Sequence, residues 1–245
     1  MKISIITVTF NSAATIAACI ASVNRQSYAN IEHIIIDGAS KDGTVEIIRS
    51  LPNRVTTIIS EPDNGIYDAM NKGIRIATGE VIGMLNSDDQ LFSTSSIATI
   101  AAGFVEKQVD CIFGNLIFTD NSGKITRIWR SKPFSSGLFT KSWTPAHPTF
   151  YCKRNLYERH GYYKTDYRIA ADVELMLRFL EVHKISSGFL DELLVNMQAG
   201  GVSNQGIKST ITITKELRRA FKENGLPFNL LKYLFFKGAK IREFI

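Results

Sequence analysis

Hydrophobic and polar residues along the first ninety positions follow a pattern that predicts strands separated by helices. Runs rich in β-branched residues indicate strands over residues 2–9, 31–36 and 54–60, and a fourth strand begins after Gly79. Between these runs, apolar residues recur at helical spacing, which predicts helices over residues 13–24, 45–51 and 66–77. Strands separated by helices of this length imply βαβ crossovers and a mainly parallel sheet.

Beyond about residue 93 the alternation is less regular. Apolar patterns still predict helices over residues 95–105 and 172–183, and strands over residues 111–118, 125–129, 149–152 and 193–197. We therefore expect an α/β domain over residues 1–206, built on a Rossmann-like, mainly parallel sheet flanked by helices. A helical extension over residues 207–245 follows it.

Four strand ends carry polar residues that the predicted sheet brings to one edge: Asn11, Asp37, the segment 61–63 and the segment 86–89. In open α/β sheets, ligands bind outside the carboxyl ends of the strands. The adjacent acids Asp88 and Asp89 suit a Mg²⁺ or Mn²⁺ ion that bridges phosphate oxygens. An acidic turn that caps the following helix is the alternative reading of the same residues.

The composition is that of a globular protein. Hydrophobic residues make up 44% and charged residues 21% of the 245 positions, and no apolar run is long enough to cross a bilayer. The basic start of the chain leads into a short apolar run, which indicates a first strand rather than a signal peptide. The three cysteines are widely spaced and predict neither a disulfide framework nor a zinc site. We therefore expect a reduced, cytoplasmic compartment.

The net charge of +6 lies in the C-terminal extension. Residues 207–245 hold nine Lys and Arg and three Glu, whereas the other 206 residues hold 20 basic and 20 acidic side chains. A predicted helix with a basic outer face leads there into a stretch rich in Leu and Phe. This pattern favours contact with an anionic membrane surface on the inner face of the cell membrane, and packing against the body or a second subunit is the alternative. No recognised nucleic-acid module occurs in the sequence, so we expect no nucleic-acid partner.

Five blocks follow one another between residues 2 and 205: Thr7-Val8-Thr9-Phe10-Asn11, Asp37-Gly38-Ala39-Ser40-Lys41-Asp42-Gly43-Thr44, Glu61-Pro62-Asp63-Asn64-Gly65-Ile66-Tyr67-Asp68-Ala69-Met70-Asn71-Lys72-Gly73, Leu85-Asn86-Ser87-Asp88-Asp89 and Gly200-Gly201-Val202-Ser203. Together they resemble glycosyltransferase family 2, the inverting nucleotide-sugar enzymes of the GT-A fold, and are similar to the subgroup that builds bacterial surface polysaccharides. The resemblance implies a nucleotide-sugar half over residues 1–92 and an acceptor half over residues 93–206.

The resemblance also implies roles for residues of the first half. Asp37 would accept a hydrogen bond from the base of a UDP donor, because a carboxylate is only an acceptor, and Thr9 and Asn11 would line the nucleotide pocket. Asp63 would lie beside the nucleotide or the metal, and Lys72 near the donor phosphates. Each has a structural alternative: Asp37 and Asp63 suit turns, Asn11 suits the cap of the first helix, and Lys72 suits a solvated helix face.

Asn86-Ser87-Asp88 stands where the family has its Asp-X-Asp metal motif. The first acid is an amide here, so Asn86 can offer a carbonyl oxygen to a metal or to the sugar but brings no charge. Asp88 is therefore the expected ligand of a divalent cofactor, Mn²⁺ or Mg²⁺, and Asp89 would orient it.

Asp172 matches the family's catalytic base. Inverting transfer needs a carboxylate that takes the proton of the acceptor hydroxyl as the new bond forms. The family has a second acid before this position, and Ala171 replaces it here. An acid that opens a helix is also favoured by the helix dipole alone, and Glu174 is the second candidate for the base.

Two weaker elements complete the implied site. His147, between two prolines, resembles a block that touches the acceptor or the phosphate, and a structural role is the alternative. Gly201 and Ser203 lie in a glycine-rich segment that resembles the family's closing segment over the donor, and an ordinary turn is the alternative.

The resulting hypothesis is an inverting glycosyltransferase that moves a sugar from a nucleotide-diphosphate sugar, UDP-linked, to a saccharide or polyprenyl-linked acceptor in cell-surface polysaccharide synthesis. A catalytically silent sugar-nucleotide-binding or scaffold protein of the same fold is the alternative, motivated by Asn86 and Ala171. A nucleotidyltransferase and a dehydrogenase are disfavoured, because the glycine-rich loop that each needs after the first strand is missing from the sequence.

Overall fold

A computed structural model describes residues 1–120, 122–198 and 207–239. Its strands are β1 (Ile3–Thr9), β2 (Ile31–Asp37), β3 (Val55–Ser60), β4 (Val81–Met84), β5 (Gln90–Leu91), β6 (Cys111–Thr119), β7 (Ile125–Trp129), β8 (Tyr151–Lys153) and β9 (Ser187–Gln198). Its helices are α1 (Ile16–Asn24), α2 (Thr44–Ser50), α3 (Ile66–Ile76), α4 (Ser96–Lys107), α5 (Asn155–His160), α6 (Ala171–Leu177), α7 (Ile207–Glu223) and α8 (Leu230–Ala239).

The described strands form one sheet in the order β3-β2-β1-β4-β8-β6-β9-β5, with β7 paired to β6. Parallel ladders join β1 to β2 and β4, β2 to β3, and β6 to β9. The short strand β8 is antiparallel to both of its neighbours, β4 and β6, and joins the two parallel parts. The predicted class, a mixed and mainly parallel sheet flanked by helices with a helical extension, is confirmed.

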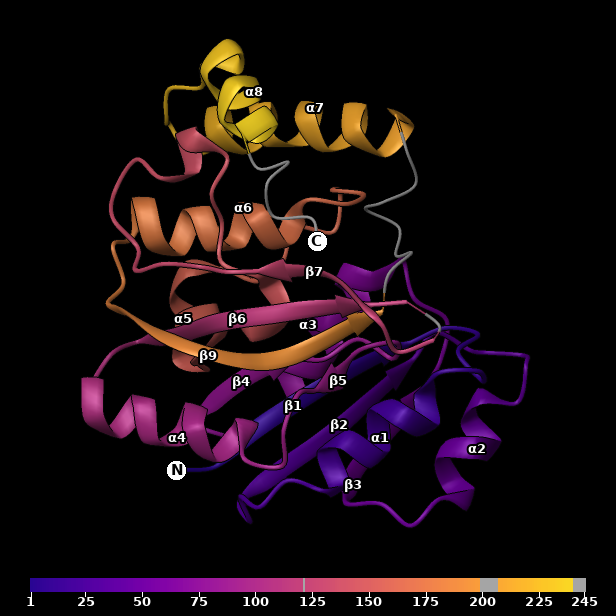
Figure 1. Ribbon diagram of the computed structural model, residues 1–245. Coiled ribbons are helices and arrows are strands. Elements are labelled where there is room, and N and C mark those ends of the chain that lie inside the picture. Colours follow the sequence, from indigo (N-terminus) through magenta and orange to yellow (C-terminus); the bar gives the residue numbers. More distant parts are fainter. Residues whose placement is uncertain (121, 199–206, 240–245) are drawn as a thin grey trace.

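Both faces of the sheet are buried, because alternate residues of each central strand face opposite helices. Ile6 and Val8 of β1 join the core beneath α3, α5 and α6. Ile3 and Ile5 of the same strand join the core beneath α1 and α4. This period of two, with apolar residues on both sides, is the pattern of a central parallel strand. The helices accordingly cover the sheet on two sides (Figure 1).

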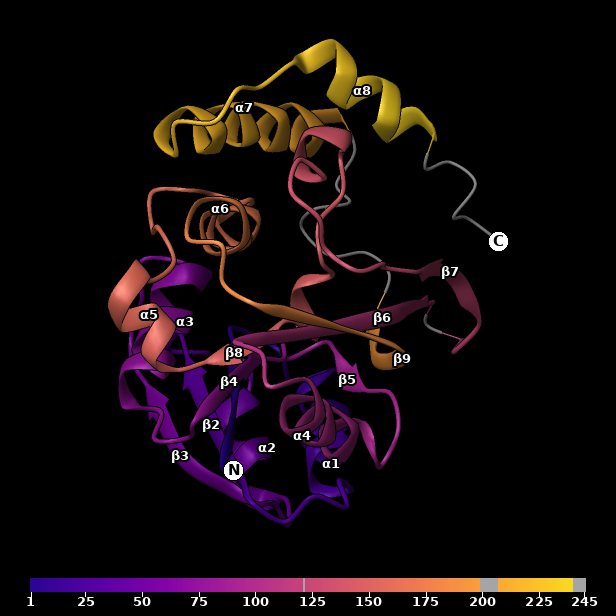
Figure 2. The same ribbon diagram turned by 90° about the vertical axis from the view of Figure 1, so that its left-hand side faces the viewer.

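The C-terminal helices form a further layer over α6. Figure 2 shows α7 beyond α6, on the side away from β1–β3, with α8 following it. Phe221 of α7 is buried in the same core as Leu175 of α6. Among the described helices, none combines the length and the apolar character needed to cross a bilayer.

The structure corrects several predicted bounds. The first helix begins at Ile16 rather than at residue 13, because the Ser12 carbonyl first closes a turn by accepting the N–H groups of Thr15 and Ile16. The helix predicted over 172–183 changes into a π-helix over Arg178–Val182. The strand predicted at 193–197 starts earlier, at Ser187, since its first half carries exposed polar residues that hide the apolar pattern.

Candidate active site

The carboxyl ends of β1, β2 and β3 bring the predicted donor residues to one edge of the sheet. Thr9 is paired with Asp37, and Asp37 with Ser60. These three residues therefore lie side by side at the ends of neighbouring strands. The end of β4 joins them, because the hydroxyl groups of Ser12 and Ser87 lie 2.8 Å apart. The sequence therefore predicted the meeting of these four strand ends correctly.

Asp37 is fully buried, and its carboxylate already accepts three hydrogen bonds. The Ser40 backbone N–H and hydroxyl donate to it, the former over 3.0 Å, and the Ser60 hydroxyl donates over 2.6 Å. A carboxylate has room for about four such bonds. Asp37 thus fixes the turn after β2, which is its structural alternative, and its contact with a base stays a prediction.

Thr9 and Asn11 differ in how they end β1. The Thr9 hydroxyl is buried without a partner among the described residues, which is a costly state that a ligand would relieve. Asn11 is exposed with a left-handed backbone, φ 49°, a conformation that asparagine tolerates well. Its side-chain oxygen accepts the Lys41 N–H over 3.0 Å, so Asn11 joins the β1 and β2 loops and does not cap the first helix.

Asp63 approaches the β2 loop closely. A Cβ atom at Gly38 would lie 2.6 Å from Asp63 Oδ2, so only glycine gives this carboxylate its present place. The other oxygen accepts the Gly65 N–H over 2.8 Å, which is the turn that its structural alternative describes. The ring of Phe10 lies beside the same glycine and is 63% exposed. An aromatic residue directly after the predicted first strand was the sequence signal for Phe10, and the sequence analysis did not single it out.

Lys72 of α3 contacts the loop that precedes this helix. Its ammonium group lies 2.8 Å from Glu61 Oε1, 2.9 Å from the Pro62 carbonyl and 3.9 Å from Asp68. The hydrogen bond to Glu61 raises the pKa of Lys72. The side chain is therefore neither free in solvent nor pointed at an open space, and its phosphate contact stays a prediction.

The predicted metal motif lies directly after β4. The Asn86 amide donates to Asp89 Oδ2 over 3.1 Å, and the remaining oxygen of each side chain is buried without a partner among the described residues. Burial, and next the charge of Asp88, raise the pKa of Asp89 well above its ordinary value. Asp88 itself is only half-buried. Asp88 is therefore the more accessible acid, and Asp89 lies behind it.

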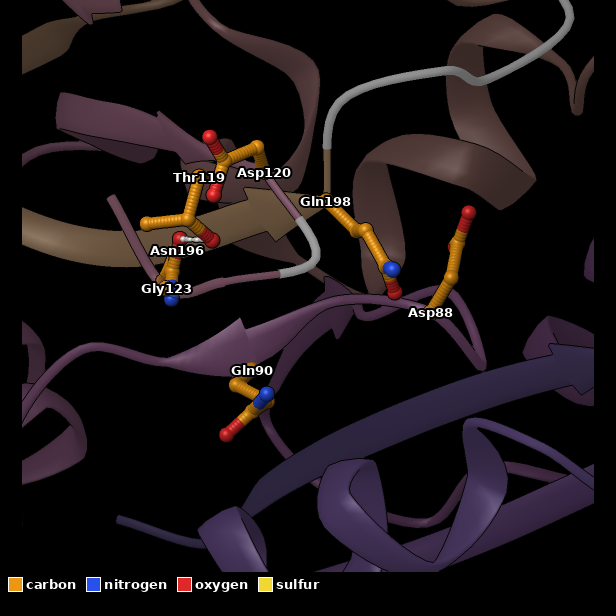
Figure 3. Close-up of a pocket in the computed structure, with 7 residues that line it drawn as sticks. All are labelled: Asp88, Gln90, Thr119, Asp120, Gly123, Asn196 and Gln198. Atoms are coloured by element: carbon orange, nitrogen blue, oxygen red, sulfur yellow. Dashed lines mark hydrogen bonds between the residues drawn. The ribbon is translucent and has the colours of Figure 1, made fainter. Parts of the chain in front are cut away.

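Asp88 lines a cavity of about 230 Å³ that the sequence did not predict (Figure 3). The other lining residues come from β5, β6, β9 and the β6–β7 turn: Gln90, Thr119, Asp120, Gly123, Asn196 and Gln198. The Thr119 hydroxyl donates to Asn196 Oδ1 over 2.9 Å, which joins β6 to β9 on one wall. Polar residues at the ends of apolar strands were again the signal, but the full length of β9 was not predicted.

Asp172 lies in the first turn of α6 and is half-buried. The Tyr67 hydroxyl reaches Asp172 Oδ1 at 3.5 Å and donates to the Ile169 carbonyl. Tyr67 belongs to the first turn of α3, so it brings the start of α6 beside the loop that follows β3. Burial raises the pKa of Asp172, and the charge of His147 opposes that shift.

His147 forms part of the same cluster. Its Nε2 atom lies 2.8 Å from the Tyr163 hydroxyl, whose ring stacks on Tyr67 with 5.8 Å between centroids. Burial lowers the pKa of His147, while the charge of Asp172 raises it. His147 and Asp172 thus lie near enough for their charges to interact, which the sequence patterns did not predict.

Glu174 is unsuited to be the base. Its carboxylate is fully buried and receives two hydrogen bonds of 3.0 Å from Arg178, and Lys164 lies 3.2 Å away. The hydrogen bonds and charge of Arg178 hold its pKa low against the opposing effect of burial. Asp172 is therefore the remaining candidate in this segment.

Glu216 of α7 holds the backbone that precedes Asp172. Its two carboxylate oxygens accept the N–H groups of Arg168, Ile169 and Ala170 over 2.6, 3.0 and 2.8 Å. These bonds anchor the backbone that leads into α6 to another helix. The sequence reasoning missed Glu216, although Glu216 and Glu223 lie seven residues apart on a basic helix and so share the face that meets the body.

Two predicted residues, Gly201 and Ser203, lie outside the described residues. In the described part of the chain, no group of three or more His, Cys, Asp or Glu side chains is arranged to hold a metal ion. Any metal bound at Asp88 would thus need further oxygen ligands from Asn86 or Asp89, from water or from the substrate.

Comparison with known sequences agrees with this arrangement. Residues 4–168 match the family model for "Glycosyl transferase family 2". The chain is 28% identical over 242 residues to a PGL/p-HBAD biosynthesis glycosyltransferase of Mycobacterium bovis, covering 97% of this chain and 91% of the relative. It is 33% identical over 180 residues to an uncharacterized glycosyltransferase of Mycobacterium tuberculosis, covering 72% of this chain and 68% of the relative.

Solved structures share the fold. The crystal structure of S. aureus TarS 1-349 matches with a TM-score of 0.72 at 18% identity, over 99% of this chain and 73% of that one. The mannosyltransferase PcManGT from Pyrobaculum calidifontis, in complex with GDP-Man and Mn²⁺, matches with a TM-score of 0.66 at 19% identity, over 91% of this chain and 63% of that one. At these identities the likeness shows the GT-A fold.

Proposed function

This chain belongs to glycosyl transferase family 2, and from that premise we propose that it transfers a sugar from a nucleotide-diphosphate sugar to a saccharide or lipid-linked saccharide with inversion. The observation that carries the proposal is the contact of Tyr67 with Asp172, because it brings a carboxylate of raised pKa to the edge where the donor strands end. A base with a pKa nearer to neutrality transfers protons more efficiently there.

The donor would be held at the ends of β1, β2 and β3. The exposed ring of Phe10 offers a face on which a base can stack. The Thr9 hydroxyl, which has no partner in the described part of the chain, and the two acids Asp37 and Asp63 offer polar contacts beside it. We propose a UDP-linked donor, and TarS structures in complex with UDP and with UDP-GlcNAc support this choice by their likeness in fold.

A divalent cation, Mn²⁺ or Mg²⁺, fits the residues after β4. Asp88 offers an accessible carboxylate, and the buried side-chain oxygens of Asn86 and Asp89 lack partners among the described residues. Hard oxygen ligands of this kind suit both ions. When bound, the cation would neutralise charge on the leaving diphosphate. Lys72 would add a positive charge near the phosphates once it exchanged its contact with Glu61.

The transfer itself would be one in-line displacement. The acceptor oxygen forms a bond to the anomeric carbon while the bond from that carbon to the diphosphate oxygen breaks, and the diphosphate leaves with the electron pair. Asp172 takes the proton of the acceptor hydroxyl, and its carboxylate becomes a carboxylic acid. The Tyr67 hydroxyl holds Asp172 in place, and the charge of His147 lowers the pKa of Asp172 against the effect of burial.

The acceptor and the pathway are inferred from a relative. The similar M. bovis protein is named for PGL/p-HBAD biosynthesis, which supports a role in making a cell-surface glycan on a lipid. We propose a saccharide or polyprenyl-linked acceptor, bound by the half formed by residues 93–206. Gly201 and Ser203 would close over the donor bound by residues 1–92. Such an acceptor places the enzyme in the cytoplasm at the inner face of the membrane.

A thermal-shift panel of nucleotide-diphosphate sugars, with and without Mn²⁺, tests the proposal. A ligand that binds only the folded protein raises its melting temperature by mass action. We expect a Mn²⁺-dependent shift with one UDP-sugar, and an equal shift with every nucleotide sugar or with none would contradict the proposed donor.

The second candidate function is a sugar-nucleotide-binding protein without catalysis. Asn86 removes a charge from the metal motif, and Ala171 replaces an acid beside the proposed base. This protein would bind the same UDP-sugar in the thermal-shift panel but would release no UDP with any acceptor. UDP release above the uncatalysed rate would exclude it.

A further inference from the structure

Helix α8 presents a row of large apolar side chains to the outside. Leu231 is 80% and Phe235 is 74% exposed, and Leu234 and Leu230 are 44% and 41% exposed. Residues three and four positions apart are neighbours on a helix surface, and the pairs 230/234, 231/234 and 231/235 therefore place these four on one side of α8. We call them the outer face of α8. Exposed apolar groups gathered in this way mark an interaction site.

The opposite side of α8 holds the helix in this orientation. Tyr233 is 7% exposed and packs on Phe228 with 5.6 Å between ring centroids, and Phe228 packs on Phe221 of α7 at 5.0 Å. The helix also packs against the 3-10 turn Phe139–Lys141. Figure 2 shows α8 in the outermost layer, away from β1–β3. The outer face is thus turned away from the body by aromatic packing.

The extension that carries the outer face exposes mainly basic side chains. Its two described acids are paired: Glu216 accepts the backbone N–H groups before α6, and Glu223 bonds to Lys164 of the body and to Arg219 of α7. The exposed side chains of the extension include Lys215, Arg218, Lys222 and Lys232. Both described acids of α7 are therefore engaged in contacts, and these four positive charges face the solvent.

We propose that the outer face of α8, with these basic side chains, binds the surface of an anionic lipid bilayer. A helix of ten residues is about 15 Å long, half of the roughly 30 Å of a hydrocarbon core, so it would lie in the interface and not span it. Apolar residues flanked by Lys and Arg are the chemistry of such interfacial helices. A second copy of this chain is a poorer occupant, because it would bring two basic extensions together.

The inference deepens the proposed function, on which it rests in one respect only: a lipid-linked acceptor lies in the membrane that α8 would bind. Binding to the bilayer itself needs neither donor nor acceptor. The two proposals can therefore fail separately, and a protein that transfers sugar to a soluble acceptor but ignores vesicles would disprove this one alone.

Sedimentation of the full chain with vesicles tests the inference. We compare vesicles of phosphatidylcholine with vesicles that also contain phosphatidylglycerol, at low and high salt. Binding should require the anionic lipid and should weaken with salt, since surface charges are screened. Equal binding to both vesicle types, or to neither, would overturn the proposal.

Variants of the outer face identify the surface involved. The double variant Leu231→Glu with Phe235→Glu should lower vesicle affinity about tenfold or more, because it removes two exposed apolar groups that would enter the bilayer and adds two negative charges. Val105→Glu in α4 is the matched control, since Val105 is 73% exposed and distant in sequence. The vesicle affinity of Val105→Glu should equal that of the parent protein. A loss of affinity as large as that of the double variant would contradict the role of α8.

Charge and assembly are tested in the same preparations. Arg218→Glu with Lys222→Glu should also reduce binding to anionic vesicles and should flatten its salt dependence. Thermal melting and UDP-sugar binding of every variant should match those of the parent protein, which excludes misfolding. A concentration-dependent dimer that the outer-face variant abolishes, without vesicle binding by the parent, would assign the face to a second copy.

Discussion

The donor edge and the segment before Asp172 are built in contrasting ways. At the donor edge, Asp37 takes two of its three hydrogen bonds from Ser40, only three residues away. Before Asp172, the partners come from far along the chain: Tyr67 is 105 residues distant, and Glu216 lies 46 residues beyond Ala170. The turn that holds Asp37 is set mostly by its local sequence, whereas the segment before Asp172 is assembled only when three helices pack. Variants can show whether the two regions also function independently.

The largest effect is expected from Asp172→Asn. An amide of the same shape cannot take a proton, so the transfer rate should fall about 10²- to 10⁴-fold. Donor affinity should stay near that of the parent, because the donor edge is built without Asp172. Initial rates of UDP release and donor titrations measure the two quantities. A parallel loss of donor affinity would show that the regions are one unit and would remove Asp172 from the role of base.

Asp88→Ala tests the donor edge in return. Removing the accessible acid should abolish the Mn²⁺-dependent part of the thermal shift and lower donor affinity about 10- to 100-fold, since even indirect supports of metal sites cost that much. Glu106→Ala, at a solvent-exposed acid of α4, is a matched control. If the Mn²⁺ dependence survived in Asp88→Ala, Asp88 would not be a ligand.

Glu216→Ala should separate positioning from chemistry. The variant leaves three backbone N–H groups without their carboxylate, and the segment before α6 loses its anchor to α7. We expect kcat to fall about tenfold through misplacement of Asp172, with an unchanged KM for the donor. Glu216→Gln keeps one carbonyl oxygen and should recover part of the rate. If donor KM rose instead, α7 would support the donor edge.

His147→Gln should have the smallest effect, seen in the pH dependence. Asp172 must be ionised to accept a proton, so kcat/KM should rise as the pH passes through its pKa, which burial raises. The charge of His147 lowers the pKa of Asp172. Removing His147 should therefore move the acidic limb of the kcat/KM profile to higher pH by less than about one pH unit. A limb that moves to lower pH would contradict this assignment, and Tyr67→Phe provides a comparison at the same carboxylate.

Sequence patterns predicted the donor edge better than the acceptor side for a physical reason. Strands β1, β2 and β4 are buried on both faces and appear as largely apolar runs, and the polar ends of β1 to β4 then meet by the geometry of a parallel sheet. The same logic found Asp37, Asp63 and Asp88. It could not foresee that Gly38 makes room for Asp63, because the residues are 25 positions apart in sequence and touch only in the fold.

The acceptor side depends on contacts that leave little trace in local patterns. The two-residue strand β5 is too short to have a period, and the first half of β9 is polar because one side of it is exposed. Asp172 was found by resemblance and not by pattern, since an acid at a helix start has an ordinary explanation. Its neighbours Tyr67 and His147 were brought to it by packing alone.

Glu216 accepts hydrogen bonds from backbone N–H groups only, so these bonds do not depend on the side chains of residues 168–170. Arg168 is exposed and Ile169 is half-buried, so both can be exchanged without cutting the bonds that anchor their backbone. Substitutions at these two residues can thus change acceptor contacts three and four positions from Asp172 while its carboxylate stays in place. The anchoring of the backbone makes this segment evolvable, because acceptor specificity can change there at little cost to the proton transfer.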